Sequence, residues 1–278
     1  MLSKFTKRTI TGVIYVAAVV ACTLSHPLAF GLLFTMCSAL TVFEFGRVVN
    51  TDSTVRMNSM LCALAAALLS LTTMAYCTRP EHDLRVFIPY MLLVMCLMTA
   101  ELYRKQPDPI SDWACTALSQ AYIALPFALL HLLAFHRGPG HTVGYNPMLP
   151  LSVFIFLWVS DTGAYCIGRL MGRHRLFPRV SPKKSWEGSI GGVVLTVASS
   201  FVIAYYFPVM DIWRWAGLAL VVAVTGAWGD LNESLLKRQK GLKDSGHVLP
   251  GHGGFLDRFD SMLLAVPAAL AYLWIVNS

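Results

Sequence analysis

Long stretches without a charged side chain recur from one end of this chain to the other. Of its 278 residues, 56% are hydrophobic and 13% are charged, whereas soluble domains carry about 25% charged residues. A run of roughly 20 apolar residues can cross a bilayer as a helix. The recurrence of such runs places the chain in a membrane and excludes an ordinary soluble enzyme.

We therefore expect an all-α integral membrane protein, a polytopic bundle of about nine transmembrane helices. The first run follows basic residues, as in a signal peptide, but no clear small-residue cleavage site comes after it, and we interpret it as a span. We expect one continuous membrane domain, with N-terminal transmembrane helices in residues 1–147 and a catalytic transmembrane part in residues 148–278. The predicted spans lie near residues 10–25, 27–45, 58–77, 86–103, 113–135, 148–168, 188–208, 211–229 and 261–277.

The distribution of lysine and arginine predicts the orientation, because cytoplasmic segments of membrane proteins are enriched in both. With a cytoplasmic N-terminus and alternating spans, all but four of the 22 basic residues fall on the cytoplasmic side. The polar loops 169–187 and 230–260 then also face the cytoplasm, where nucleotides are. We expect a multi-pass protein of the cell (inner) membrane with its active-site loops on the cytoplasmic face. The four exceptions are Arg79, Arg85, Arg137 and Arg214.

Net charge and cysteine content narrow the function classes. The formal charge of +7 fits the cytoplasmic excess of basic residues and would also suit anionic substrates. The seven cysteines are scattered and none forms a C-x-x-C pair. Small buried hydrophobic side chains are therefore a better interpretation than a disulfide framework or a zinc site.

Four short polar segments in the C-terminal half carry candidate chemistry. The first surrounds Asp161, which lies near the cytoplasmic end of an apolar run. An ionisable residue at such a depth indicates function more often than packing alone. Asp161 shares a helix face with Ala164 and Gly168, small residues that would let another helix approach.

The second segment, residues 181–188, reads Ser-Pro-Lys-Lys-Ser-Trp-Glu-Gly and lies just before a span. Ser181, Lys183 and Lys184 can donate hydrogen bonds to phosphate oxygens. The two lysines could equally anchor the span at the cytoplasmic surface, and for this segment alone that alternative is the stronger one.

The third segment, residues 229–238, presents Asp230, Ser234 and Lys237 on one helix face. Glu233 can pair with Lys237 four residues on. Asp230 and Glu233 could instead form a capping box at a helix start. If the preceding span runs on without a break, no cap is needed, and Asp230 is a carboxylate held at the membrane surface.

The fourth segment, residues 243–260, combines cations, carboxylates, histidines and glycines. Asp257 and Asp260 offer hard oxygen ligands that suit Mg²⁺ together with phosphate and water, while no histidine spacing here indicates zinc. Gly253 and Gly254 beside His252 would permit close approach of the backbone to a phosphate. The alternatives are solvated loop histidines and a turn before the last span.

The order and spacing of these segments resemble the signature of the phosphatidate cytidylyltransferase (CDP-diacylglycerol synthase) family. Residues 234–260 read Ser-x-Leu-Lys-Arg, four residues, Lys-Asp-x-Gly, two residues, Leu-Pro-x-His-Gly-Gly-Phe-x-Asp-Arg-Phe-Asp. The segments at 160–169 and 181–188 also look like family motifs, with Ser185 where many members carry threonine. The N-terminal half is similar only as a run of spans.

The resemblance implies an Mg²⁺-dependent nucleotidyltransferase that condenses CTP with phosphatidic acid, giving CDP-diacylglycerol and pyrophosphate for phospholipid biosynthesis. It places the metal on Asp230 and Asp257, and a second cation is compatible with the family. Catalytic positions implied by the resemblance are Asp161, Lys237, Arg238, Lys243, Asp244, Arg258 and Asp260. Substrate-binding positions are Ser181, Lys183, Lys184, Ser234, His252, Gly253 and Gly254.

Two alternatives stay open. A CTP-dependent transferase or kinase acting on an ether lipid or a polyprenol would share the signature, which does not select the lipid. A membrane transporter would place its polar residues near the middle of the bilayer, within an inverted repeat, whereas here they gather at one face. The expected partners are CTP, phosphatidic acid and membrane lipids, without nucleic acid, and a homodimer is compatible with the family.

Overall fold

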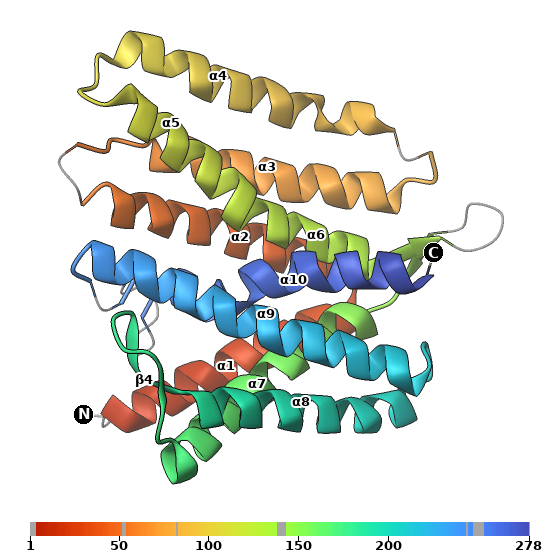
Figure 1. Ribbon diagram of the computed structural model, residues 1–278. Helices are drawn as coiled ribbons and strands as arrows, with labels where there is room; N and C mark the ends of the chain where they lie inside the picture. Colours follow the sequence, from red (N-terminus) through yellow and green to blue (C-terminus); the bar gives the residue numbers. More distant parts are fainter. Residues whose placement is uncertain are drawn as a thin grey trace. The chain divides into compact units, whose positions relative to one another are not determined.

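The computed structural model describes residues 4–51, 54–81, 83–137, 143–242, 244–246 and 253–277. A 3₁₀ turn (Leu84–Phe87) precedes α4, and a π-helical segment (Ser119–Ala124) joins α5 to α6. Two hairpins pair β1 (Phe135–Arg137) with β2 (Val143–Tyr145), and β3 (Arg175–Phe177) with β4 (Ser181–Ser185). The helices drawn in Figure 1 are α1 (Lys4–Ser25), α2 (Pro27–Val49), α3 (Ser59–Thr78), α4 (Ile88–Arg104), α5 (Pro109–Leu118), α6 (Leu125–Ala134), α7 (Met148–Met171), α8 (Trp186–Tyr206), α9 (Ile212–Gln239) and α10 (Leu256–Asn277).

The prediction of an all-α polytopic membrane protein is confirmed. Within the described residues, eight helices are long and apolar enough to cross a membrane, and a shorter apolar helix, Thr9–Ser25, matches the first predicted run. Helices α2 and α9 extend beyond the predicted runs, to Val49 and Gln239. Because α9 continues through Asp230 without a break, the capping-box alternative at that residue is wrong.

The chain divides into two compact units. The first unit comprises Met1–Pro147 and Gln239–Phe259, and the second comprises Met148–Arg238 and Asp260–Ser278. Helix α10 thus begins in the first unit and continues in the second. The placement of catalysis in residues 148–278 stays a prediction.

In the first unit, α2 packs against α3 and α6 (Figure 1). The fully buried rings of Phe30 and Phe34 lie 4.9 Å apart in this core. A line of polar groups crosses the same core, since Thr35 Oγ1 lies 2.8 Å from Ser70 Oγ, which lies 3.0 Å from His131 Nε2. Hydrocarbon offers no hydrogen-bond partner, so these groups stabilise the helix contacts by binding one another.

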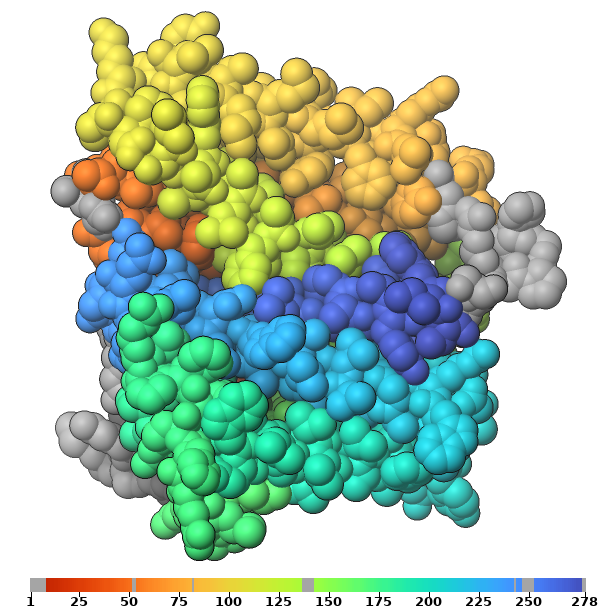
Figure 2. All heavy atoms as spheres, in the orientation of Figure 1, coloured from red at the N-terminus to blue at the C-terminus, as the bar shows by residue number. Residues whose placement is uncertain are grey.

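Helix α4 presents an apolar surface outward. Its side chains stand out on the face shown in Figure 2, in the yellow part of the chain. Met91, Leu92 and Met95 are all more than half exposed. A contiguous exposed apolar surface on a spanning helix suits contact with lipid.

In the second unit, α7 and α8 approach closely because small residues line both helices. A Cβ atom at Gly188 would meet the carbonyl oxygen of Ala164 and the Cα atom of Gly168. A Cβ atom at Gly192 would meet the carbonyl oxygen of Ser160. The Ala164 and Gly168 face that the spacing predicted for helix approach is therefore the face against which α8 packs.

The polar segment between α7 and α8 contains the β3–β4 hairpin, which the sequence did not predict. Arg175 pairs with Ser185 across the hairpin, and the register is irregular between Arg175 and Phe177. Ser185 then begins α8, because its Oγ accepts a hydrogen bond from Gly188 N over 3.2 Å. The hairpin thereby holds Lys184 next to the first turn of α8.

Candidate active site

Three carboxylates of the second unit gather at one place. One carboxylate oxygen from each of Asp230, Glu233 and Asp260 lies within 4.8 Å of the other two. Asp230 and Glu233 are one turn apart on α9, and Asp260 lies near the start of α10. Glu233 is 1% exposed, and the other two residues are half-buried. We call these three residues the acidic cluster.

Gly229 explains how two helices bring these side chains together. A Cβ atom at this position would meet the carbonyl oxygen of Asp260 and the Cα atom of Ser261. The missing side chain therefore lets the backbones of α9 and α10 approach at the level of the acidic cluster. Gly229 is thus a contact point within a continuous helix.

Two lysines and a serine contact the acidic cluster. Lys184 Nζ, from β4, lies 2.5 Å from Asp230 Oδ2, and Lys237 Nζ lies 2.5 Å from Glu233 Oε2. Ser234 Oγ donates a hydrogen bond to Asp230 Oδ1 over 3.3 Å. The predicted pair of Glu233 with Lys237 is confirmed. The two ammonium groups offset part of the repulsion among the carboxylates.

Other predicted site residues of the second unit lie around this cluster or on the hairpin. Asp161 on α7 is close enough to Asp260 for the two carboxylates to repel each other. Arg238 Nε donates a hydrogen bond to the carbonyl oxygen of Val180 over 3.3 Å, which ties the end of α9 to the hairpin turn. Two more predicted residues lie on β4, the half-buried Ser181 and the exposed Lys183.

The remaining described site residues belong to the first unit. We call residues 244–246 and 253–257 the signature loop. Asp257 Oδ2 accepts hydrogen bonds from Ser245 N over 3.0 Å, from Ser245 Oγ over 2.9 Å and from Gly254 N over 2.8 Å. One charged oxygen thus holds both described stretches of the loop. Gly253 has a φ of 81°, a backbone conformation that favours glycine.

The structure leaves part of the predicted site untested. Asp244 and Arg258 are exposed in the first unit, whereas Lys243 and His252 lie outside the described residues. Asp230 and Asp257 belong to different compact units. Their joint coordination of a metal ion therefore stays a prediction.

Two carboxylates that the sequence did not assign to a site lie beside predicted site residues. Glu233 was expected as the partner of Lys237 or as part of a capping box, and it belongs to the acidic cluster. Glu44 lies on α2 in the N-terminal half, and its Oε2 accepts a hydrogen bond from Leu256 N over 2.8 Å. An ionisable residue inside an apolar run was the signal that could have found Glu44.

The acidic cluster has the donors that a divalent cation requires. Mg²⁺ prefers hard oxygen ligands and uses one or two carboxylates together with phosphate and water. A carboxylate as buried as Glu233 is unfavourable unless a cation or hydrogen bonds compensate it, and Lys237 supplies part of that compensation. The three residues therefore fit a divalent cation.

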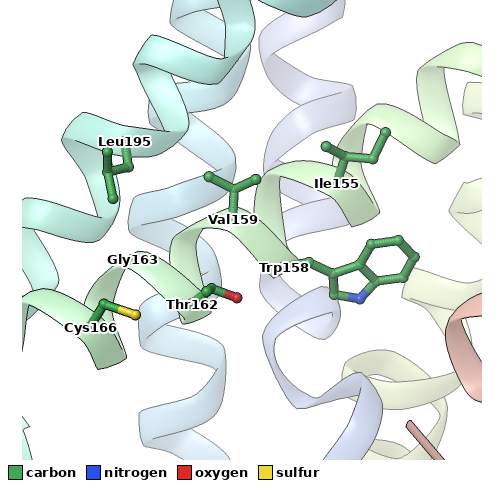
Figure 3. A pocket seen from close by; sticks show the side chains of 7 residues that line it. All are labelled: Ile155, Trp158, Val159, Thr162, Gly163, Cys166 and Leu195. Carbon is green, nitrogen blue, oxygen red and sulfur yellow. The ribbon is translucent and has the colours of Figure 1, made fainter. Parts of the chain in front are cut away.

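A separate hollow of the second unit has an apolar lining. This cavity of about 420 Å³ is lined along α7 and, on the α8 side, by Leu195. Figure 3 shows that its lining side chains are mostly carbon, with the hydroxyl of Thr162 as a polar group. Such a lining suits hydrocarbon rather than a charged nucleotide. The lining residues are Ile155, Trp158, Val159, Thr162, Gly163, Cys166 and Leu195.

The described chain combines spanning helices with an acidic cluster and adjacent lysines. With the signature of residues 234–260, these features define a class of membrane proteins that carry a polar site on their spanning helices. Residues 6–276 match the cytidylyltransferase family. The chain belongs to this family. The membership expected from residues 160–260 is confirmed, and the match extends through the N-terminal half.

The chain is also similar to curated proteins named phosphatidate cytidylyltransferase. It is 37% identical over 172 residues to the protein of Staphylococcus haemolyticus (strain JCSC1435), covering 62% of this chain and 63% of that relative. It is 39% identical over 157 residues to the protein of Staphylococcus aureus (strain COL), covering 56% and 57%. It is 40% identical over 157 residues to the protein of Staphylococcus epidermidis (strain ATCC 12228 / FDA PCI 1200), covering 56% of this chain and 57% of that relative. Each match spans less than two thirds of the relative's own length.

Proposed function

We propose that this chain is a phosphatidate cytidylyltransferase. An oxygen of the phosphate of phosphatidic acid attacks the α-phosphorus of CTP and forms a new phosphorus–oxygen bond. The bond from the α-phosphorus to the bridging oxygen of the β-phosphate breaks, so CDP-diacylglycerol and pyrophosphate result. The observation that carries the proposal is the acidic cluster beside two lysines in a chain of the cytidylyltransferase family.

Charge is the central difficulty of this reaction, because both substrates are anions. Catalysis therefore depends mainly on positioning and charge neutralisation. Asp230, Glu233 and Asp260 would hold Mg²⁺, with Asp257 as the further ligand that the family signature suggests. When bound, the ion withdraws charge from the phosphate oxygens of the nucleophile and the leaving group.

The lysines of the acidic cluster have a second role in this proposal. Lys184 and Lys237 each carry an ammonium group with three hydrogen-bond donors, and each uses part of this capacity on a carboxylate. The carboxylate contacts orient the two ammonium groups toward the acidic cluster. In this role both groups would also bind phosphate oxygens of the substrates. Asp161 would position the groups around Asp260, and Ser234 would position Asp230.

The basic residues supply binding sites for the two anionic substrates. Lys243 and Arg258, with the backbone around Gly253 and Gly254, would bind the triphosphate and shape the nucleotide pocket. Ser181 and Lys183 on the hairpin would bind the lipid phosphate. The lipid would enter from the bilayer and CTP from the cytoplasm, as the distribution of basic residues predicts.

An assay of the full-length chain in detergent tests this function. Labelled CTP would be supplied with a panel of lipid phosphates and phosphate-free lipids, and both the lipid product and pyrophosphate would be measured. We expect CDP-diacylglycerol and an equal amount of pyrophosphate from phosphatidic acid. We also expect EDTA to stop turnover and Mg²⁺ to restore it, because the anions need a divalent counterion.

The same panel separates the alternatives. Preferred turnover of an ether-lipid phosphate or of a phosphate-free polyprenol would assign the chain to a different lipid. Consumption of CTP without pyrophosphate release would indicate a kinase. Turnover that continues unchanged in EDTA would contradict the metal role of the acidic cluster.

A further inference from the structure

Glu44 connects a helix of the N-terminal half to the signature loop. Its side chain lies on α2 and is 4% exposed. Glu44 Oε2 accepts a hydrogen bond from Leu256 N over 2.8 Å, although the two residues are 212 positions apart in the sequence. Leu256 immediately precedes Asp257, so Glu44 holds the backbone at the end of the loop.

Two glycines of the signature loop make room for the Glu44 carboxylate. A Cβ atom at Gly246 or at Gly254 would overlap that carboxylate. Glu44 therefore touches both described stretches of the loop. Asp257 joins the same two stretches through its hydrogen bonds with Ser245 and Gly254.

The surroundings of Glu44 favour a role in the site over a role in folding alone. A cavity of about 470 Å³ lies between α2 and the loop, and its lining includes Glu44, Arg47, Asp244 and Ser245. A buried carboxylate in a spanning helix is unfavourable, and an apolar side chain would pack against the loop at a lower cost. The chain nevertheless has a carboxylate at position 44, where the loop backbone donates a hydrogen bond to it.

We propose that Glu44 is a positioning residue for the signature loop. It fixes Leu256 N and supports Gly246 and Gly254, so that Gly253, Gly254 and Asp257 adopt the arrangement that CTP requires. This inference rests on the proposed function, since the loop residues are assigned to CTP through it. Glu44 acts through the loop and makes no contact with the reacting atoms in this proposal.

The test compares Glu44→Ala, Glu44→Gln and a matched control in the full-length chain. Glutamine keeps an oxygen that can accept the hydrogen bond from Leu256 N, and alanine does not. We expect kcat/KM for CTP to fall about tenfold to a hundredfold in Glu44→Ala, the loss typical of a misplaced group. We expect Glu44→Gln to stay within about threefold of wild type, because its hydrogen bond is kept. The KM for phosphatidic acid should not change.

Glu101→Ala is the control, because Glu101 is another buried carboxylate of the first unit. It is 7% exposed and forms an ion pair with Arg104, on its own helix, rather than with the loop. Both alanine variants remove a buried charge from a spanning helix. A purely structural role would lower the folded fraction in both variants and leave the kcat/KM per folded molecule unchanged.

A readout without catalysis comes from hydrogen exchange. The amide of Leu256 should lose protection in Glu44→Ala and keep it in Glu101→Ala. If the wild-type chain makes no CDP-diacylglycerol, the proposed function fails, and the exchange comparison still decides the role of Glu44.

A double-mutant cycle with Gly246→Ala tests the same contact from the side of the loop. Gly246→Ala adds a methyl group where the Glu44 carboxylate lies, so it should disturb the loop in the wild type and have little further effect beside Glu44→Ala. Wild-type kcat/KM and exchange in Glu44→Ala would overturn the proposal. The proposal would also be overturned if the double variant lost kcat/KM by the product of the losses in Glu44→Ala and Gly246→Ala, because the two positions would then act independently.

Discussion

Asp257 gathers three hydrogen-bond donors on one oxygen, and asparagine cannot reproduce that role. An amide places either an uncharged oxygen or a competing NH₂ group against the three donors. We expect Asp257→Asn to lower CTP-dependent turnover about a hundredfold or more, while expression and membrane insertion stay at wild-type levels. Rates of CDP-diacylglycerol formation, divided by the amount of folded protein, would check this.

The control for this variant is Asp211→Asn. Asp211 is a half-exposed carboxylate that lies just before α9 and pairs with Arg214 in the first turn of that helix. Loss of the Asp211 charge should leave turnover unchanged. Wild-type turnover in Asp257→Asn would remove Asp257 from both the metal and the loop assignments.

Sequence spacing predicted those site residues that share one helix. Asp230, Ser234 and Lys237 were expected on one face of a helix, and the pair of Glu233 with Lys237 follows from the same spacing. The contact of Lys184 with Asp230 could not be predicted, because it depends on how the hairpin lies against α9. The contact of Glu44 with Leu256 could not be predicted for the same reason, because spacing says nothing about a partner in a distant segment.

Hydrophobic runs in the sequence located the helices better than they located the ends of those helices. The span at 211–229 was expected to stop near Gly229, with a continuous helix left open, and α9 continues to Gln239. The hairpin of β3 and β4 was missed because Ser-Pro-Lys-Lys-Ser has no alternation of apolar and polar residues. Its strands form beside charged residues that no periodic pattern marks.

Gly229 supplies a prediction for the pair α9 and α10. In Gly229→Ala the new methyl group would meet the backbone of Asp260 and Ser261, which cannot rotate away, so the two helices must separate. We expect a destabilisation of about 1–3 kcal/mol and a clear loss of turnover, because Asp230 and Asp260 move apart. Thermal unfolding in detergent and initial rates would measure the two effects.

Gly226→Ala is the matched control, one turn earlier on the same helix. Its methyl group would meet the end of the Leu157 side chain, and its contacts with Ser261 would be ordinary ones. A leucine side chain can adjust, so the effect should be small. Equal losses in the two variants would show that α9 tolerates no added volume anywhere, and the specific role of Gly229 would then be wrong.

For the whole molecule, composition predicted a membrane protein, and its long apolar helices confirm this class. The orientation drawn from the distribution of basic residues stays a prediction. The grouping of segments into two compact units was beyond the sequence. The described residues between 240 and 259 belong with the N-terminal helices, whereas α9 up to Arg238 belongs to the other unit, although the family signature runs through both. A linear motif does not report which unit each of its parts joins, because that depends on buried partners such as Glu44.

The orientation itself can be decided at the two ends of α8. This helix has 21 residues, about 31 Å at the usual rise, which matches a hydrocarbon core of about 30 Å. Position 179 in the hairpin turn and position 209 after α8 are both exposed, and they must lie on opposite sides of the membrane. In a chain without its native cysteines, we expect Val209→Cys to react with an impermeant maleimide in intact cells. Arg179→Cys should react only after permeabilisation. The reverse pattern would contradict the cytoplasmic placement of the site, and labelling of both in intact cells would contradict α8 as a span.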